Sequence, residues 1–215
     1  MPRYREDPSE TVLKDEDIRK MFDKTRDLQE QALLSCLWIT GARPSEVLEL
    51  KKENVLITED VVVFDLPTKK LQADGTHFVL KRRQLRIGRP HGLQMNIYLE
   101  TVVKYAERLY HPEDPVFIYG RRWAIKVINR LGMQGIGKEV APYHLRHSAV
   151  TREASRGQTI DQLMHFKGAK SIQSVQPYLH ASPYDVVLPS QPSSIPPPTP
   201  ASPLPPKKPV QEPVK

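Results

Sequence analysis

The chain has 215 residues, 27% of them charged, and its formal net charge is +7. It shows no apolar run of membrane-spanning length, no signal peptide and no cysteine–histidine spacing typical of zinc sites. Its one cysteine, Cys36, lies in an apolar run and cannot form an internal disulfide, so we expect an intracellular protein without bound metal.

The amino-terminal half begins with helical patterns and then becomes rich in β-formers. Apolar spacing predicts three helices, over 14–25, 28–39 and 44–50. Gly41 fits the end of the second helix, and Pro44 fits the first turn of the third. β-Branched and aromatic runs predict three strands, over 60–66, 76–80 and 84–87. An Asp-Gly pair within 67–75 predicts a turn between the first two strands.

Helical patterns return in the second half of the chain. The predicted helices cover 92–109, 121–130, 144–155 and 159–166. Helices, a few strands and helices again, without βαβ alternation, predict an α+β fold. We expect a mostly helical domain with a small antiparallel β-sheet on one edge.

The end of the chain has a different composition. Residues 189–215 hold eleven of the 21 prolines and lack periodic apolar residues. Such a segment cannot bury enough apolar surface to offset its ordering entropy. The sequence therefore predicts one folded domain over residues 1–188 and a disordered proline-rich tail over residues 189–215.

A basic run follows the predicted turn. Within nine residues that contain no acid lie Lys81, Arg82, Arg83, Arg86 and Arg89. A basic cluster on a globular domain indicates a polyanionic partner, most often nucleic acid, although a solvated face is the alternative.

Two short strings place an arginine beside a helix-forming run. Arg43 lies in Thr-Gly-Ala-Arg-Pro-Ser-Glu (40–46), and Arg146 lies in His-Leu-Arg-His-Ser (144–148). Tyr178 follows the second string. Two arginines can neutralise the non-bridging oxygens of a phosphodiester while a tyrosine attacks the phosphorus without a metal.

Each of these residues also has a structural explanation when it is taken alone. Arg43 could pair with Glu46 or Glu49, and Lys69 and Lys70 could be solvated turn lysines. The histidines around the second string could cap a helix or fill the core, and a single tyrosine usually packs.

The order and spacing of the motifs resemble the catalytic domain of the tyrosine recombinases, also called the phage integrase family. Residues 37–50 look like the first arginine motif of that family, 145–151 resemble the second, and 163–173 with 178–180 resemble the final segment. The resemblance covers roughly 13–180. It implies a site-specific DNA recombinase or integrase of a prokaryotic host, which cleaves and rejoins double-stranded DNA through a 3′-phosphotyrosyl intermediate. It also implies a homotetramer on recombining DNA, with no metal, ATP or other cofactor.

The resemblance assigns roles to individual positions. Arg43 and Arg146 would clamp the scissile phosphate, Lys69 would protonate the leaving 5′ oxygen, and Tyr178 would be the nucleophile. The implied catalytic residues are Arg43, Lys69, Tyr143, Arg146 and Tyr178. The implied DNA contacts are Lys70, Lys81, Arg82, Arg83 and His144, and Lys70 is also the fallback for Lys69. His147 would support packing rather than react.

The chain departs from the family pattern at two positions. Tyr143 stands where the family usually has histidine, and His144 is displaced from that position by about 100° around the helix. Ala169 stands where histidine or tryptophan is usual, and His165, one turn earlier, could partly compensate. We expect a divergent and slower recombinase.

Family members usually carry a helical DNA-binding domain before the catalytic one, but only about a dozen residues precede the first predicted helix here. We therefore expect either an isolated catalytic domain or a minimal recombinase that depends on oligomerisation. Three other functions stay open: DNA relaxation like that of type IB topoisomerases, a catalytically impaired DNA-binding module and an unrelated basic helical protein. Strand exchange would exclude the first, and a covalent protein–DNA adduct would exclude the second.

Overall fold

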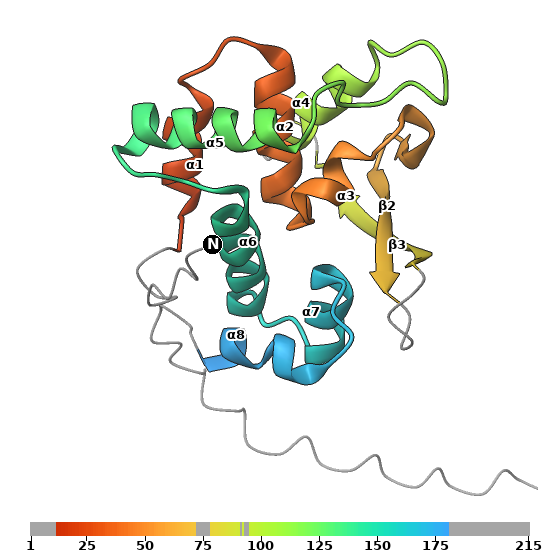
Figure 1. Cartoon of the computed structure of the whole chain (residues 1–215), viewed down its shortest axis with the longest axis vertical. Coiled ribbons are helices and arrows are strands. Elements are labelled where there is room, and N and C mark those ends of the chain that lie inside the picture. The colour runs from red at the N-terminus through yellow and green to blue at the C-terminus, as the bar shows by residue number, and fades with distance from the viewer. Residues whose placement is uncertain (1–11, 72–77, 91, 93–94, 181–215) are drawn as a thin grey trace, which may run out of the picture. The chain divides into compact units, whose positions relative to one another are not determined.

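The computed structural model describes residues 12–71, 78–90, 92 and 95–180 (Figure 1). The predicted Asp-Gly turn and the predicted tail over 189–215 lie outside these residues. Within them, no helix combines the length and apolar character needed to cross a membrane.

Three helices open the described chain: α1 (Asp15–Phe22), α2 (Leu28–Thr40) and α3 (Pro44–Leu48). The Asp27 side chain caps α2 by accepting hydrogen bonds from the amides of Gln29 and Glu30. Gly41 ends α2 in the left-handed region, with φ of 55°, and Pro44 occupies the first turn of α3. Gly41 and Pro44 therefore end and begin these helices as the sequence predicts.

A short 3₁₀ helix, η2 (Lys52–Asn54), leads into a three-stranded antiparallel sheet. Its strands, in spatial order, are β1 (Val55–Ile57), β2 (Val61–Leu71) and β3 (Phe78–Gly88). Val61 pairs with Gly88 and Leu71 pairs with Phe78, so β2 and β3 form one long hairpin.

This sheet corrects three details of the prediction. Residues 67–71, expected in a turn, continue β2, and residues 78–88 form one strand where two were expected. β1 was not predicted, because three residues are too few for alternation to be recognised. Long-range pairing overrides local turn preference here.

The second half is helical. Its elements are α4 (Ile97–Ala106), α5 (Arg121–Ile136), α6 (Pro142–Ser155), α7 (Ile160–Lys167), η4 (Ile172–Ser174) and α8 (Gln176–His180). α5 continues past residue 130, where the sequence predicted its end, and passes through Gly132 and Gly135. A Cβ at Gly135 would lie 2.8 Å from the backbone of Met21, and one at Gly132 would lie 2.6 Å from the Val140 side chain. Both glycines thus permit close packing inside a helix.

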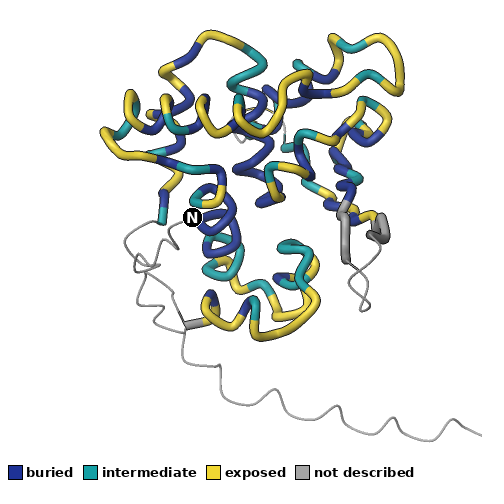
Figure 2. Tube along the Cα trace, in the orientation of Figure 1, coloured by how far each residue is buried: buried dark blue, intermediate teal, exposed yellow. Residues whose placement is uncertain are grey.

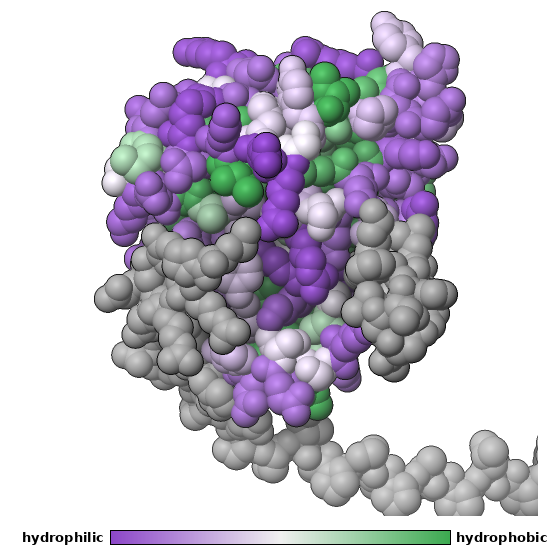
Figure 3. Space-filling view, viewed as in Figure 1, coloured by the Kyte–Doolittle hydropathy of each residue, from purple (hydrophilic) through white to green (hydrophobic). Residues whose placement is uncertain are grey.

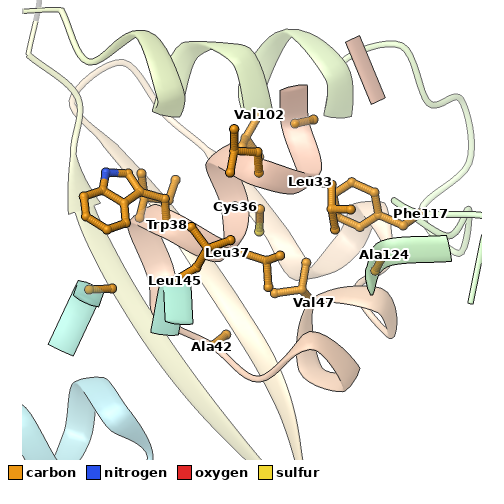
Figure 4. Packing of buried hydrophobic residues seen from close by; sticks show 14 of the residues in the cluster. Leu33, Cys36, Leu37, Trp38, Ala42, Val47, Val102, Phe117, Ala124 and Leu145 are labelled. Atoms are coloured by element: carbon orange, nitrogen blue, oxygen red, sulfur yellow. The ribbon is translucent and has the colours of Figure 1, made fainter. Parts of the chain in front are cut away.

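The core is built around α2, which contacts α4 and α6 and also α1 and α5. Buried residues run along α2 and α6 (Figure 2). Figure 4 shows Leu33, Cys36 and Leu37 of α2 among Val102 of α4 and Leu145 of α6. Burial raises the pKa of the Cys36 thiol to about 12, so Cys36 acts as a small core residue, as predicted.

The carboxyl-terminal helices connect α6 to the sheet. α6 contacts α7 and α8, and α7 reaches β3 through a 2.8 Å contact between His165 Nε2 and the Gln84 carbonyl oxygen. Hydrophilic residues gather between α6 and the hairpin on the face shown in Figure 3. The two arginine motifs and the tyrosine segment meet in this part of the fold.

Candidate catalytic site

Arg43 lies in the turn between α2 and α3 and is the N-cap of α3. Its backbone amide donates to Glu46 Oε2 at 2.8 Å, and its Nη1 donates to Glu46 Oε1 at 2.9 Å. The Arg43 side chain is 48% exposed despite this ion pair. A half-exposed guanidinium held at one edge remains available to a phosphate.

Arg146 is buried in α6 and connects two helix ends. Nη1 donates to the Gly41 carbonyl at 2.7 Å, and Nη2 donates to the Lys167 carbonyl at 2.6 Å. These oxygens belong to the carboxyl termini of α2 and α7, where unpaired carbonyls and the helix dipole favour a cation. Burial and the nearby charge of Arg43 lower the pKa of Arg146 to about 10, which leaves it cationic at neutral pH.

Arg83 does not occupy the place expected of a DNA contact. Its side chain is 7% exposed and donates to Glu46 Oε2 at 3.1 Å and to the carbonyls of His165 and Phe166. The prediction of a surface residue overlooked strand alternation: Arg83 and Leu85 face the interior, while the residues on either side of Arg83 face solvent. Arg83 therefore joins β3 to α7.

The outward residues of the basic run are accessible. Arg82 is exposed and pairs with Asp65 at 2.7 Å, and Arg86 is exposed. Arg89, at the end of the run, pairs with Glu100, and its side chain is only 21% exposed, against 47% for Arg82. Arg82 and Arg86 thus remain the described members that can meet a polyanion directly.

Glu46 is the carboxylate that organises the arginines. It lies 2.9 Å from Arg43, 3.1 Å from Arg83 and 4.0 Å from Arg146, and its side chain is 4% exposed. Burial alone would raise the pKa of this carboxyl, but the Arg43 amide and the three guanidinium charges outweigh it and hold the pKa below its ordinary value. Sequence reasoning noted Glu46 only as a partner of Arg43.

Tyr178 lies on α8 and is 5% exposed. Its ring packs against the His147 ring at a centroid distance of 5.0 Å, in keeping with the packing role expected for His147. Burial and the neighbouring Tyr143 raise the pKa of Tyr178 to about 12, and Arg146 opposes this shift. The phenol is therefore protonated at neutral pH before any substrate binds.

Tyr143 and His144 open α6 in different environments. Tyr143 is 65% exposed and lies near enough to Tyr178 to influence its pKa. His144 Nδ1 accepts a hydrogen bond from the Ala141 amide at 3.1 Å, so this imidazole caps the helix. Its predicted contact with DNA would have to use the other ring nitrogen.

The lysines of the hairpin are placed by their backbone register. Lys69 pairs with Leu80, Lys70 pairs with Val79, and Lys81 pairs with Thr68. Lys69 and Lys70 lie within β2 rather than in the predicted turn, and Lys81 lies within β3. Their side chains are outside the described part of the structure, so their roles stay predictions.

The segment after α7 contains the second departure from the family pattern. Gly168 ends α7 with φ of 63°, and the Ala169 amide donates to the Met164 carbonyl at 2.8 Å. The Nε2 of His165 is occupied by the Gln84 carbonyl. The expected compensation of Ala169 by His165 is therefore not supported. Lys167, which sequence reasoning did not select, instead lies over the Tyr178 ring.

Among the residues that the structure describes, no three histidine, cysteine or acidic side chains are grouped so that they could hold a metal ion.

Fold and site together define an α+β domain in which arginines from the α2–α3 turn, β3 and α6 converge near a buried tyrosine. The chain belongs to the phage integrase family, whose model matches residues 11–184. Tyrosine recombinase XerD of Listeria innocua is 25% identical over 183 residues, which cover 80% of this chain and 58% of XerD. Tyrosine recombinase XerC of Herpetosiphon aurantiacus is 27% identical over 166 residues, covering 72% and 49%. The chain thus spans about half to three-fifths of these relatives.

Two solved structures share the fold. The XerH site-specific recombinase bound to difH substrate, in a pre-cleavage complex, matches with a TM-score of 0.60 at 19% identity, over 79% of this chain and 50% of XerH. The XerA recombinase matches with a TM-score of 0.59 at 22% identity, over 84% and 61%. The predicted family and the predicted α+β fold with an edge sheet are confirmed.

Proposed function

We propose that this chain is the catalytic domain of a tyrosine-type site-specific recombinase acting on double-stranded DNA. The observation that carries the proposal is the convergence of Arg43, Arg146 and Tyr178 from three separate elements. Arg146 is close enough to both other residues for each to influence its pKa. Family membership and relatives named as recombinases add support.

The proposed reaction is a transesterification. The Tyr178 phenol releases its proton to water as its oxygen bonds to phosphorus, and the bond from phosphorus to the 5′ oxygen breaks. Arg43 and Arg146 stabilise the negative charge that grows on the non-bridging oxygens. Lys69 gives a proton to the leaving oxygen. The ester that remains keeps the energy of the broken bond, so rejoining needs only attack by a 5′-hydroxyl.

Duplex DNA would lie across the face that carries the hairpin and the start of α6. Arg82, Lys70 and Lys81 of the hairpin and His144 would contact phosphates, with Tyr143 as a hydrogen-bond donor near the reacting group. Assembly as a tetramer on two recombining sites, and a location at the DNA of a bacterial host, are part of the same proposal.

The test is covalent trapping on a nicked duplex taken from the neighbourhood of the gene. The wild-type chain should form an adduct that survives denaturing electrophoresis. Tyr178→Phe should abolish the adduct while leaving DNA affinity within a few-fold, because only one hydroxyl is lost. Tyr184→Phe is the matched control and should behave like the wild type.

An adduct that persists in Tyr178→Phe, or that maps to Tyr184, contradicts the assigned nucleophile. DNA binding without any adduct would favour the catalytically impaired DNA-binding module. Two observations agree with that alternative: the high pKa of Tyr178 and the departure from the family pattern at Ala169. Relaxation of supercoils without strand exchange would favour the topoisomerase-like activity.

A further inference from the structure

Lys167 ends α7 at the point where three parts of the site meet. Its Nζ lies 4.5 Å from the centroid of the Tyr178 ring and donates to the Ser174 carbonyl. Its own carbonyl accepts the hydrogen bond from Arg146 Nη2 at 2.6 Å. The position of Lys167 is thus fixed on both sides, by the tyrosine segment and by the second arginine motif.

The charges around Lys167 are positive and disfavour its protonated, ammonium form. Arg146 faces it from α6 and Arg43 from the α2–α3 turn, while the Tyr178 ring on α8 is neutral. Burial, Arg146 and Arg43 together lower the pKa of Lys167 to about 8. Glu46 already serves Arg43, Arg83 and Arg146. Cations that crowd one another at a partly buried site are stabilised when an anion binds among them.

We propose that Lys167 is a third cationic ligand of the scissile phosphate, beside Arg43 and Arg146. The inference rests on the proposed function, because it adds a contact to the same site. Its geometric basis is the placement of one ammonium next to the attacking tyrosine and within the field of both arginines.

Phosphate binding then becomes linked to protonation. The bound anion favours the ammonium form and raises the pKa of Lys167 above its value in the free protein. The contribution of Lys167 to binding is complete below the free pKa of about 8 and is lost as the pH rises through the higher bound pKa. Affinity and cleavage rate should therefore decline in alkaline solution.

The first experiment uses sulfate, a dianion across this pH range, and does not depend on cleavage. Lysine side chains of the full chain are labelled with carbon-13 at Cε, and the Lys167 resonance is assigned by its absence from Lys167→Arg. Sulfate should raise the Lys167 pKa by about one unit relative to chloride at equal ionic strength, a tenfold coupling of protonation to anion binding. The exposed Lys170 is the internal control and should not respond. Equal pKa values of Lys167 in sulfate and chloride would overturn the inference.

The second experiment measures single-turnover cleavage of the nicked duplex against pH. Lys167→Met should lower the rate about tenfold or more, as expected for the loss of one charged donor. Lys167→Arg should keep much of the rate and remove the alkaline decline, because arginine stays protonated. Lys170→Met should match the wild type in both respects.

A wild-type rate in Lys167→Met, or an alkaline decline that is unchanged in Lys167→Arg, would overturn the role of Lys167. Failure of the proposed function has a different signature: the wild type would form no adduct, while sulfate would still raise the Lys167 pKa. That result would support the anion site and refute the recombinase activity.

Discussion

Glu46→Gln should destabilise the site more than any similarly small change, because it removes charge but hardly any volume. The glutamine can still accept the hydrogen bond that Glu46 takes from the Arg43 amide, so the start of α3 is kept. The three guanidinium groups within 4.0 Å lose their common carboxylate. Two of them, Arg83 and Arg146, are buried and have no route to solvent without repacking.

The size of the effect follows from this geometry. Breaking a buried ion pair by removing one partner costs about 3–5 kcal/mol, because an uncompensated buried charge is left behind. A domain of this size loses about 2–4 °C in Tm for each kcal/mol. We therefore expect the Tm at neutral pH to fall by on the order of 10 °C.

The pH dependence distinguishes lost charge from lost packing. The pKa of Glu46 lies below its ordinary value, so its stabilisation is present above the unfolded pKa and is lost as the pH falls through the folded one. The difference in Tm between wild type and Glu46→Gln should be constant near neutral pH and should disappear in acid.

Thermal unfolding followed by circular dichroism at several pH values is the assay. Glu16→Gln is the matched control: it makes the same chemical change in an exposed pair with Lys20 and should leave Tm nearly unchanged. A fall of less than about 2 °C for Glu46→Gln, or a gap that persists undiminished in acid, would refute the view of Glu46 as the organising charge.

Three further predictions concern a glycine with positive φ, the exposed arginines of β3 and the position of Ala169. Gly41→Ala should lower stability by about 1–3 kcal/mol in urea unfolding, because φ is 55° and the new Cβ would lie 2.7 Å from the Phe166 ring; an unchanged midpoint would contradict this. Arg82→Ala combined with Arg86→Ala should reduce the salt dependence of duplex binding by about one to two phosphate equivalents, and an unchanged slope would place the DNA surface elsewhere. Ala169→His should raise single-turnover cleavage about tenfold by adding a donor, whereas a slower enzyme with an intact fold would show that the site is built around another group.

Local sequence patterns alone determined the family, one helix boundary and the burial of the central helix. The two arginine motifs and the tyrosine segment identify the family because their spacing is a property of the sequence itself. Gly41 and Pro44 fix the boundary between α2 and α3, since a left-handed residue and a missing amide act within one turn. The apolar run around Cys36 indicates a buried helix, and α2 is buried almost all round.

The extents of α5 and of the β2–β3 hairpin depend on which elements pack together, and local sequence patterns do not determine that. α5 continues through Gly132 and Gly135 although glycine disfavours a helix interior, and only glycine fits there because Val140 and Met21 approach too closely for a side chain. The hairpin extends through residues 67–71 because the register with β3 continues there. Neighbours distant in sequence supply the packing and hydrogen bonds that outweigh local preference in both places.

The charges of the site show the same division. The sequence determined that Arg43, Arg83, Arg146 and Lys167 are present, but not which of them face solvent. The tertiary structure decided that Arg83 is buried on the inner face of β3 and that Lys167 lies over Tyr178. The physical reason is that the solvation and partners of a charge depend on contacts between distant segments. Composition counts a buried ion pair and an exposed cation alike, whereas their electrostatic energies differ severalfold.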